Sequence, residues 1–227
     1  MTEAQAYSCR DTGFATIGFD KLMVYQMIKK KQHHIPSLYT VEHTNLKAVK
    51  RFIKTLHYSH KTKGIKTKHC FGLYREGVFT PDLIGAIIYA LPSMPKPAQK
   101  YCPTNPDKLL ELVRLVCIDD TLKNTESYFI GFTLRWLKKY TDYKVVLSYA
   151  DPMFGHNGTI YKATNFIHSG MTGSKRSVVV DGKRFHERIL TDKHKFAKEV
   201  QNRFNNNDKD IKIIKTKPKH IYLYKLR

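Results

Sequence analysis

The chain has 227 residues, of which 41% are hydrophobic and 12% aromatic, so it can bury a core without stabilising disulfides. Forty Lys and Arg against nineteen Asp and Glu give a formal net charge of +21, which favours a polyanionic partner, most often nucleic acid, over a merely soluble basic protein. No apolar run approaches the ~20 residues of a membrane span, and the first residues lack the apolar core of a signal peptide. The four cysteines have no zinc-like spacing, which favours free thiols in a reducing compartment. We therefore expect a cytoplasmic protein without membrane association.

The first half of the chain predicts a strand, an amphipathic helix and a β-hairpin between an N-terminal extension and a surface loop. In chain order these segments are residues 1–36 (extension, with His33 and His34), 37–43 (strand), 45–56 (helix), 69–77 and 83–92 (hairpin) and 93–109 (loop). Apolar side chains three and four apart mark the helix, and Thr44 is its expected cap. The basic stretch 61–69 predicts an exposed loop.

The central segment, residues 110–170, predicts alternating strands and helices. Its elements are a strand at 110–120, a helix at 127–140, a strand at 144–152 and a helix from Thr159. Loops that follow parallel strands and lead into helices are where α/β proteins hold ligands. The first of these helices has a one-sided apolar stripe, on which Trp136 is expected to be core rather than a cofactor platform.

The C-terminal part predicts two closing strands, an amphipathic helix and a basic tail. These elements are expected at residues 167–172 and 175–190 (strands, with a turn at Asp181–Gly182), 191–204 (helix) and 211–227 (tail). The tail mixes cations with aromatics, which suits either contact with phosphates or an edge strand of the main sheet. We expect residues 1–190 to form a catalytic domain, and residues 191–227 to pack on that domain or extend it.

Three residues of the central segment are candidates for chemistry. Arg114 stands in the middle of a strand, where it is either ion-paired, with Asp119 or Asp151, or bound to a ligand. Asp151 ends a strand before Pro152, so it either points into a ligand crevice or caps the following turn. Tyr161, just inside a helix, is placed either for packing or to donate a proton to a leaving group.

The beginning of the central helix is a candidate phosphate site. Asn124 or Thr125 is its expected cap, and Ser127 lies in the first turn. The unpaired amides there and the positive end of the helix dipole suit a pyrophosphate.

The end of the first helix is a candidate metal site. His57, Tyr58 and His60 lie there, and with Asp151 they offer imidazole, phenolate and carboxylate ligands compatible with iron or zinc. The alternative is that the histidines only complement the negative end of the helix dipole.

The predicted element order resembles the GNAT acyltransferase superfamily. That resemblance implies an α/β (α+β) fold, a mixed central sheet flanked by helices, here with a basic C-terminal extension. The Q/R-x-x-G-x-G/A loop that usually binds pyrophosphate is replaced by DDTLKNTES. ELVRLVCIDDTLKNTESYF and VVLSYADPMFGHNGTIYKATNF, and more loosely LHYSH, are similar to the Mom family of phage DNA-modification proteins.

The resemblance implies a reaction and a set of functional residues. The reaction would be carbamoylmethylation of the exocyclic amine of adenine in double-stranded DNA, which protects phage DNA from host restriction in the host cytoplasm. Acetyl-CoA is the implied donor, an iron requirement is compatible with the family, and the base must be flipped out of the duplex. The implied residues are Asp151, Tyr161, His57 and Tyr58 for catalysis, with His57, Tyr58 and Asp151 as metal ligands, Arg114, Ser127, Asn124 and Thr125 for the cofactor, and Tyr74 as a weaker match. Asp151 or His57 would accept the amine proton, and Tyr161 would protonate the departing thiolate.

The basic residues expected to contact DNA lie in two stretches. They are Lys61, Lys63, Lys66 and Lys68 in the first stretch and Lys175 and Arg176 in the second. Two other functions stay open, a GNAT-like acetyltransferase acting on RNA or another amine, and a non-catalytic DNA-binding protein.

Overall fold

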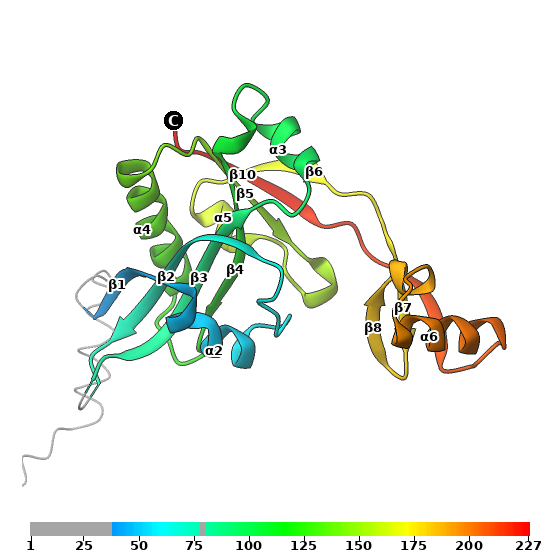
Figure 1. Cartoon of the computed structure of the whole chain (residues 1–227). Helices are drawn as coiled ribbons and strands as arrows, with labels where there is room; N and C mark the ends of the chain where they lie inside the picture. The colour runs from blue at the N-terminus through cyan, green and yellow to red at the C-terminus, as the bar shows by residue number, and fades with distance from the viewer. Residues whose placement is uncertain (1–37, 78–79) are drawn as a thin grey trace, which may run out of the picture. The chain divides into compact units, whose positions relative to one another are not determined.

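A seven-stranded mixed sheet organises the chain in the computed structural model, which describes residues 38–77 and 80–227 (Figure 1). In spatial order its strands are β1 (Tyr39–Thr44), β2 (Lys66–Arg75), β3 (Asp82–Leu91), β4 (Leu109–Cys117), β5 (Val145–Ala150), β10 (His220–Lys225) and β6 (Ile167–Met171). Neighbouring strands are antiparallel except β4 and β5, which are parallel. The predicted fold class, a mixed sheet flanked by helices, is confirmed.

Helix α2 (Leu46–Leu56) covers one face of this sheet. Its apolar stripe buries Val49 and Ile53 against β2 and β3, as the spacing of the side chains predicts. The cap is Asn45, whose side chain accepts the Ala48 N–H, so the expected cap at Thr44 is wrong by one residue. Thr44 instead pairs with Cys70 as the last residue of β1.

Helix α4 (Thr125–Tyr140) covers the opposite face, together with the short helix α5 (Thr159–Ala163). Tyr89 of β3 hydrogen-bonds Thr133 of α4, whereas its neighbour Ile88 faces α2, as the alternation of side chains along a strand requires. Trp136 is half-buried and packs edge-on against Phe71, which agrees with its predicted packing role.

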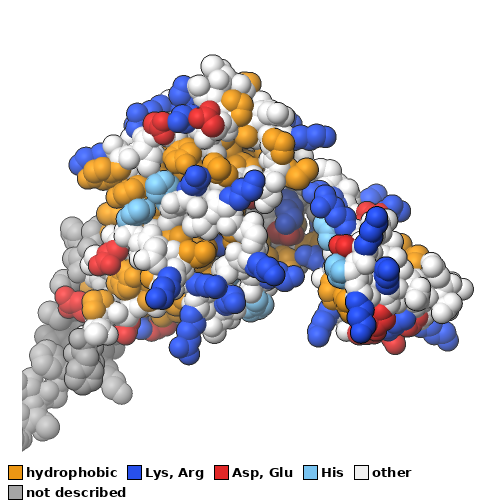
Figure 2. Space-filling view, viewed as in Figure 1, with side chains coloured by type: hydrophobic (Ala, Val, Ile, Leu, Met, Phe, Trp, Pro, Cys, Tyr) orange, Lys and Arg blue, Asp and Glu red, His pale blue; other side chains and the backbone are white. Residues whose placement is uncertain are grey.

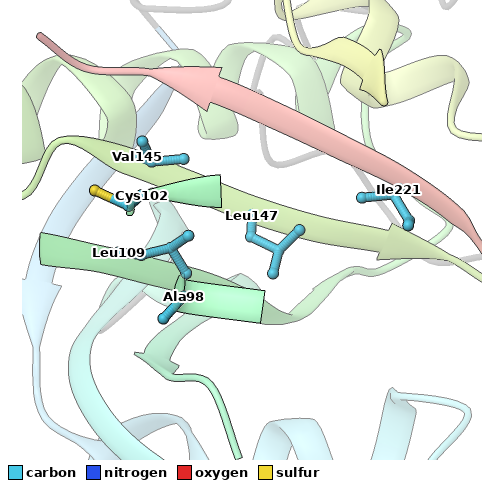
Figure 3. Packing of buried hydrophobic residues seen from close by; sticks show 6 residues of the cluster. All are labelled: Ala98, Cys102, Leu109, Val145, Leu147 and Ile221. Carbon is cyan, nitrogen blue, oxygen red and sulfur yellow. The ribbon is translucent and has the colours of Figure 1, made fainter. Parts of the chain in front are cut away.

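Residues 93–109, predicted as a loop, contain helix α3 (Pro95–Tyr101) and the 3-10 turn η2 (Pro106–Lys108). Prolines misled the prediction, because the first turn of a helix needs no N–H donor and accepts Pro95 without cost. The helix closes a hydrophobic cluster over β4, β5 and β10, shown in Figure 3. The buried residues of this cluster are Ala98, Cys102, Leu109, Val145, Leu147 and Ile221. By strand alternation, α3 shares the face of the sheet that α2 covers.

A separate three-stranded sheet interrupts the chain between β6 and β10. Its strands are β7 (Arg176–Val180), β8 (Lys183–His186) and β9 (Ile211–Lys215), and with the 3-10 turn η4 (Glu187–Leu190) and helix α6 (Lys195–Asn205) they form what we call the inserted lobe, residues 176–215. The hairpin turn at Asp181–Gly182 has positive φ at both residues, as predicted. The hairpin does not close the main sheet, however, because β7 pairs only with β8 and β9 in the described chain.

Two short segments, 172–175 and 216–219, connect the inserted lobe to the main sheet, and we call them the neck. The Thr172 N–H donates to the Lys219 carbonyl at 2.9 Å, and the Thr216 N–H donates to the Lys175 carbonyl at 2.7 Å. The chain then enters β10, which lies between β5 and β6 and is therefore not the edge strand proposed for the tail.

Other expectations have mixed outcomes. The exposed loop predicted at 61–69 ends earlier, because β2 begins at Lys66. The described cysteines, Cys70, Cys102 and Cys117, are free thiols. No helix within residues 38–77 and 80–227 is long and apolar enough to cross a membrane. The extension at 1–36, with His33 and His34, lies outside the described residues.

Candidate active site

Strands β4 and β5 separate in the middle of the sheet. They pair from Leu109 with Val145 to Leu112 with Ser148, after which β4 runs on to Cys117 beside β3 alone. Strand β5 stays paired with β10 up to Ala150. Because each strand follows a different neighbour, a gap opens between them, and a cavity of about 210 Å³ lies there.

The cavity wall combines residues from both faces of the sheet. His57 and Tyr58 come from the end of α2, Arg114 from β4, and Tyr161 from α5 on the other face. These four candidates come from three segments that are far apart in the sequence, and the structure brings all of them together. The cavity between the separated strands is thus lined by polar and aromatic groups from both faces of the sheet.

Tyr161 is almost fully buried, with 8% of its surface exposed. Ser148 lies next to its hydroxyl, and the Ser148 hydroxyl donates to the Leu112 carbonyl at 3.2 Å, where the two strands part. Burial raises the pKa of the Tyr161 phenol to about 12, and the neighbouring Ser148 hydroxyl opposes this shift. The phenol is therefore protonated at neutral pH and can act as a proton donor.

His57 is held in one tautomer. The Ser59 N–H donates to Nδ1 at 3.1 Å, and since an amide can only donate, Nδ1 carries no proton. Burial, then the charges of Arg114, His156 and His60, lowers the pKa of His57 to about 4. The ring is thus neutral at pH 7 and carries its proton on Nε2. This arrangement favours hydrogen-bond donation into the cavity over the acceptance of a proton.

Arg114 forms no ion pair with either carboxylate suggested by the sequence. Its Nε donates to the Lys61 carbonyl at 3.1 Å and one terminal nitrogen donates to the Val113 carbonyl at 2.6 Å. Burial lowers its pKa, and Tyr58 and Glu111 oppose this effect. The guanidinium keeps further N–H donors, which allows it to bind an anionic or carbonyl oxygen in the cavity.

Asp151 lies at the beginning of the loop that carries the cavity wall from residue 155 to residue 161. Its carboxylate is buried, accepts the Met153 N–H at 3.1 Å and contacts the Lys219 ammonium at 2.9 Å. It is not among the residues that line the cavity. The predicted turn cap is therefore present, and the carboxylate also ties this loop to the neck.

Gly158 allows the same loop to approach β10. Its φ is +75°, and a Cβ at this position would lie 2.2 Å from the Tyr222 ring. The Tyr222 hydroxyl donates to the Asn157 carbonyl at 2.9 Å. Only glycine fits here, and the close approach fixes where α5 begins and hence the position of Tyr161.

Sequence reasoning did not single out Glu111 and Tyr149, which lie in a second cavity of about 270 Å³ beside the first. Tyr149 lines both cavities, and Lys219 lines the second. Burial raises the pKa of Glu111, while Arg114 and Lys219 oppose the shift, and no ion pair joins Glu111 to any described residue. The signal in the sequence was an acidic residue inside the apolar run LLELVRL.

The predicted phosphate and metal sites have different outcomes. Ser127, Asn124 and Thr125 do open helix α4, where Asn124 has φ +71° and its side chain makes no capping bond, but they do not line either cavity. The proposed iron ligands do not fit a metal centre, because Nδ1 of His57 is bonded to Ser59 and the Asp151 carboxylate to Lys219. In the described part of the chain, no group of three or more His, Cys, Asp or Glu could hold a metal ion.

The basic residues expected to contact DNA are exposed. Figure 2 shows Lys and Arg side chains spread over the visible surface, with few acidic ones among them. Lys61 and Lys63 lie in the segment between α2 and β2, and Lys66 and Lys68 lie on β2. Arg176 is already ion-paired with Glu187. Tyr74, the weaker match, lies on β2 outside both cavities.

Comparison with known proteins gives the family. The model of the Mom protein family matches residues 38–227. The chain belongs to the Mom protein family. The methylcarbamoylase Mom of Escherichia phage Mu is 30% identical over 140 residues, which are 60% of this chain and 54% of the phage Mu protein. The chain therefore spans about half the length of this curated relative, and the resemblance seen in the sequence is confirmed.

Solved structures similar to the chain are acetyltransferases. The ribosomal-protein-S18-alanine N-acetyltransferase of Escherichia coli has a TM-score of 0.45 and 9% identity, over 83% of this chain and 94% of that one. Arabidopsis thaliana NAA60 in complex with acetyl-CoA has a TM-score of 0.46 and 10% identity, over 82% and 98%. At such scores the likeness carries no argument about the chemistry of this chain.

Proposed function

We propose that this member of the Mom family is a DNA-modifying transferase that converts the exocyclic amine of adenine in double-stranded DNA to a carbamoylmethyl derivative, and thereby protects phage DNA from restriction. The observation that supports the proposal is the cavity between β4 and β5, which Tyr161 and Arg114 line together with His57 and Tyr58. The net charge of +21 supports a DNA substrate.

The residues around the cavity between β4 and β5 suit acetyl-CoA as the donor. Residues 113–115 of β4 lie beside β3 but have no partner in β5. Pairing with β5 therefore does not use the backbone groups on that side, which leaves room there for an extended ligand between the strands. The amides at the beginning of α4, near Asn124 and Ser127, suit its pyrophosphate. When bound, acetyl-CoA would supply the two carbons and leave as the free thiol. The reaction would also consume a nitrogen donor for the amide and a two-electron oxidant, because the bond to the adenine amine forms at the methyl carbon of the acetyl group. Arg114 and the Nε2–H of His57 would hold its carbonyl oxygen by donating hydrogen bonds.

Tyr161 and Glu111 are the proposed proton carriers. The protonated Tyr161 phenol, which lies next to Ser148, would donate to the departing thiolate. The adenine amine is a weak nucleophile and must lose a proton, and Glu111, whose pKa is raised by burial, is suited to accept it. Asp151 or His57 was expected in this role. The Asp151 carboxylate is engaged with Lys219, so we assign it to positioning the loop before Tyr161, and the lowered pKa of His57 makes that ring a weak base.

The test is mass analysis of nucleosides from the DNA of cells that express the full chain. We expect a carbamoylmethylated adenine nucleoside with the parent protein, and roughly 100-fold less with Tyr161→Phe. Tyr224→Phe is the matched control, because Tyr224 packs on Phe166 of the same region but does not line the cavity. Unmodified DNA adenine alongside acetylated RNA would instead support an acetyltransferase. DNA binding without any modified nucleoside, in the parent and the variants alike, would support a non-catalytic protein.

A further inference from the structure

Two exposed aromatic rings stand beside the cavity. Tyr58 and Phe154 are each 42% exposed, although residues of this kind are usually more buried. Their ring centroids are 4.3 Å apart and the rings are tilted by 34°. Tyr58 follows α2 directly and Phe154 belongs to the 3-10 turn η3 (Pro152–Phe154), so two distant segments meet to form the pair.

The pair continues inwards to the cavity. The His57 ring lies 4.3 Å from Tyr58 with a tilt of 30°, and the His156 ring lies 5.4 Å from Tyr58. His57, Tyr58 and His156 all line the cavity. A series of rings thus runs from solvent, through Tyr58, to the residues proposed to hold the reacting groups.

We propose that Tyr58 and Phe154 are the stacking platform for the extruded nucleobase, an inference that rests on the proposed function. A flipped base loses its stacking neighbours in the duplex, and aromatic side chains replace them whatever the base. The partner is nucleic acid rather than an apolar peptide, because exposed cations, Lys61 and Lys63, follow Tyr58 within five residues and suit the flanking phosphates. The platform also explains why these rings remain exposed in the free protein.

The role is stacking and not chemistry of the phenol. Stacking requires the π face of residue 58 and is indifferent to the hydroxyl, so Tyr58→Phe should preserve it while Tyr58→Leu removes it. A role as metal ligand or acid predicts the opposite, because both substitutions remove the oxygen. Phe154 has no hydrogen-bonding group, so Phe154→Leu removes only the ring, together with its contact to the Arg184 guanidinium, which lies 5.4 Å from the ring centroid.

The experiment uses the full chain and a duplex that holds 2-aminopurine opposite an abasic site, so that the fluorescent base is already free to leave the stack. We expect the parent to change the fluorescence of this base on binding. Tyr58→Leu and Phe154→Leu should each weaken binding about tenfold and abolish the change in fluorescence, with an unchanged dependence of affinity on salt. Tyr58→Phe should behave as the parent. Tyr140→Leu is the matched control, since Tyr140 is 60% exposed and does not line the cavity.

Two results would overturn the platform. The first is that Tyr58→Phe weakens DNA binding as much as Tyr58→Leu does. The second is that Tyr140→Leu weakens DNA binding as much as Tyr58→Leu does. Nucleoside analysis of the same proteins separates this inference from the proposed function. If a Tyr58→Leu, Phe154→Leu double variant yields as much modified adenine as the parent, the platform is refuted and the proposed function stands. If the fluorescence changes as expected but no modified adenine forms, the platform stands as a base-binding site and the proposed function is refuted.

Discussion

The region around the β4–β5 gap and the inserted lobe differ in how completely they are packed and in where they place polar groups. The gap interrupts strand pairing in the middle of a sheet and is surrounded by polar groups, among them the buried His57 and Tyr161 and the half-buried Arg114. The inserted lobe has a complete small core in which Val178, Val200 and their neighbours are fully buried, and it holds nearly twice as many Lys and Arg as Asp and Glu. The first region is less completely packed and contains a polar cavity, whereas the second has a complete core and an excess of basic residues.

This contrast predicts that the two regions fail in different ways. A substitution in the lobe core should remove structure locally, whereas one near the gap should change the chemistry or its dependence on pH. The following predictions test this separation.

The largest effect is expected from Val200→Asp, which buries an unpaired carboxylate in the lobe core and costs several kcal/mol. The lobe should unfold while the main sheet stays folded, and DNA affinity should fall at least tenfold with the loss of an ordered basic surface. Hydrogen exchange should show protection lost from residues 176–215 and kept in β3 and β4. Asn202→Asp adds the same charge on an exposed position of α6 and should change neither property. Loss of protection from both sheets together would contradict the separation.

Gly158→Ala should cost about 3 kcal/mol or more, because it combines a left-handed backbone with a collision against Tyr222. Gly155→Ala is a matched control with the same φ of +75° and no atom within 4 Å of the added Cβ. It should cost only about 1 kcal/mol, the backbone part alone. Urea unfolding measures both, and equal losses would show that the contact with β10 contributes nothing.

His57 should make stability depend on pH. Its pKa is lowered from 6.5 to about 4, so the unfolded chain takes up a proton below pH 6.5 while the folded chain does not until about pH 4. Stability is therefore expected to decrease as pH falls through this range, by about 2 kcal/mol after allowance for solvent screening. The difference in unfolding free energy between pH 7 and pH 4.5 should be smaller in His57→Gln. Identical differences would mean that His57 is not held neutral by burial.

The smallest effect concerns the exposed cations. Lys61→Gln with Lys63→Gln should weaken DNA binding a few-fold and reduce the salt slope by about 2. Arg176→Gln should change the slope less than either lysine does, because Glu187 already neutralises that charge. Lys138→Gln with Lys139→Gln, at the exposed end of α4, is the control. Equal salt slopes in all of these variants would mean that DNA binds to a different surface of the protein.

Local patterns made part of the fold predictable. The spacing of Val49 and Ile53 gave α2, and the stripe through Phe129, Thr133 and Leu137 gave α4, because each helix buries one face of its own sequence. Helix α3 was missed because prolines tolerated in a first turn look the same as prolines in a loop. The place of β10 between β5 and β6 depends on long-range pairing, for which the sequence has no local sign.

The candidate site was also predictable only in part. Arg114 and Tyr161 were noticeable because of their positions within a strand and a helix start, and the structure brings them to one cavity, while their roles remain predictions. The contact of Asp151 with Lys219 joins residues remote in sequence, so no pattern could reveal it. Phe154 resembles any apolar turn residue until its exposure and its contact with Tyr58 are known.

The hydrogen bonds across the neck have a consequence for how such a protein can change. Because Thr172 and Lys219 are already bonded to each other, the main sheet is complete at the point where the chain departs and returns. An appendage attached in this way can be exchanged for a different one, or shortened to a tight turn, without altering the strands on either side. Related proteins could thus acquire a different lobe at this junction while the cavity between β4 and β5 stays unchanged.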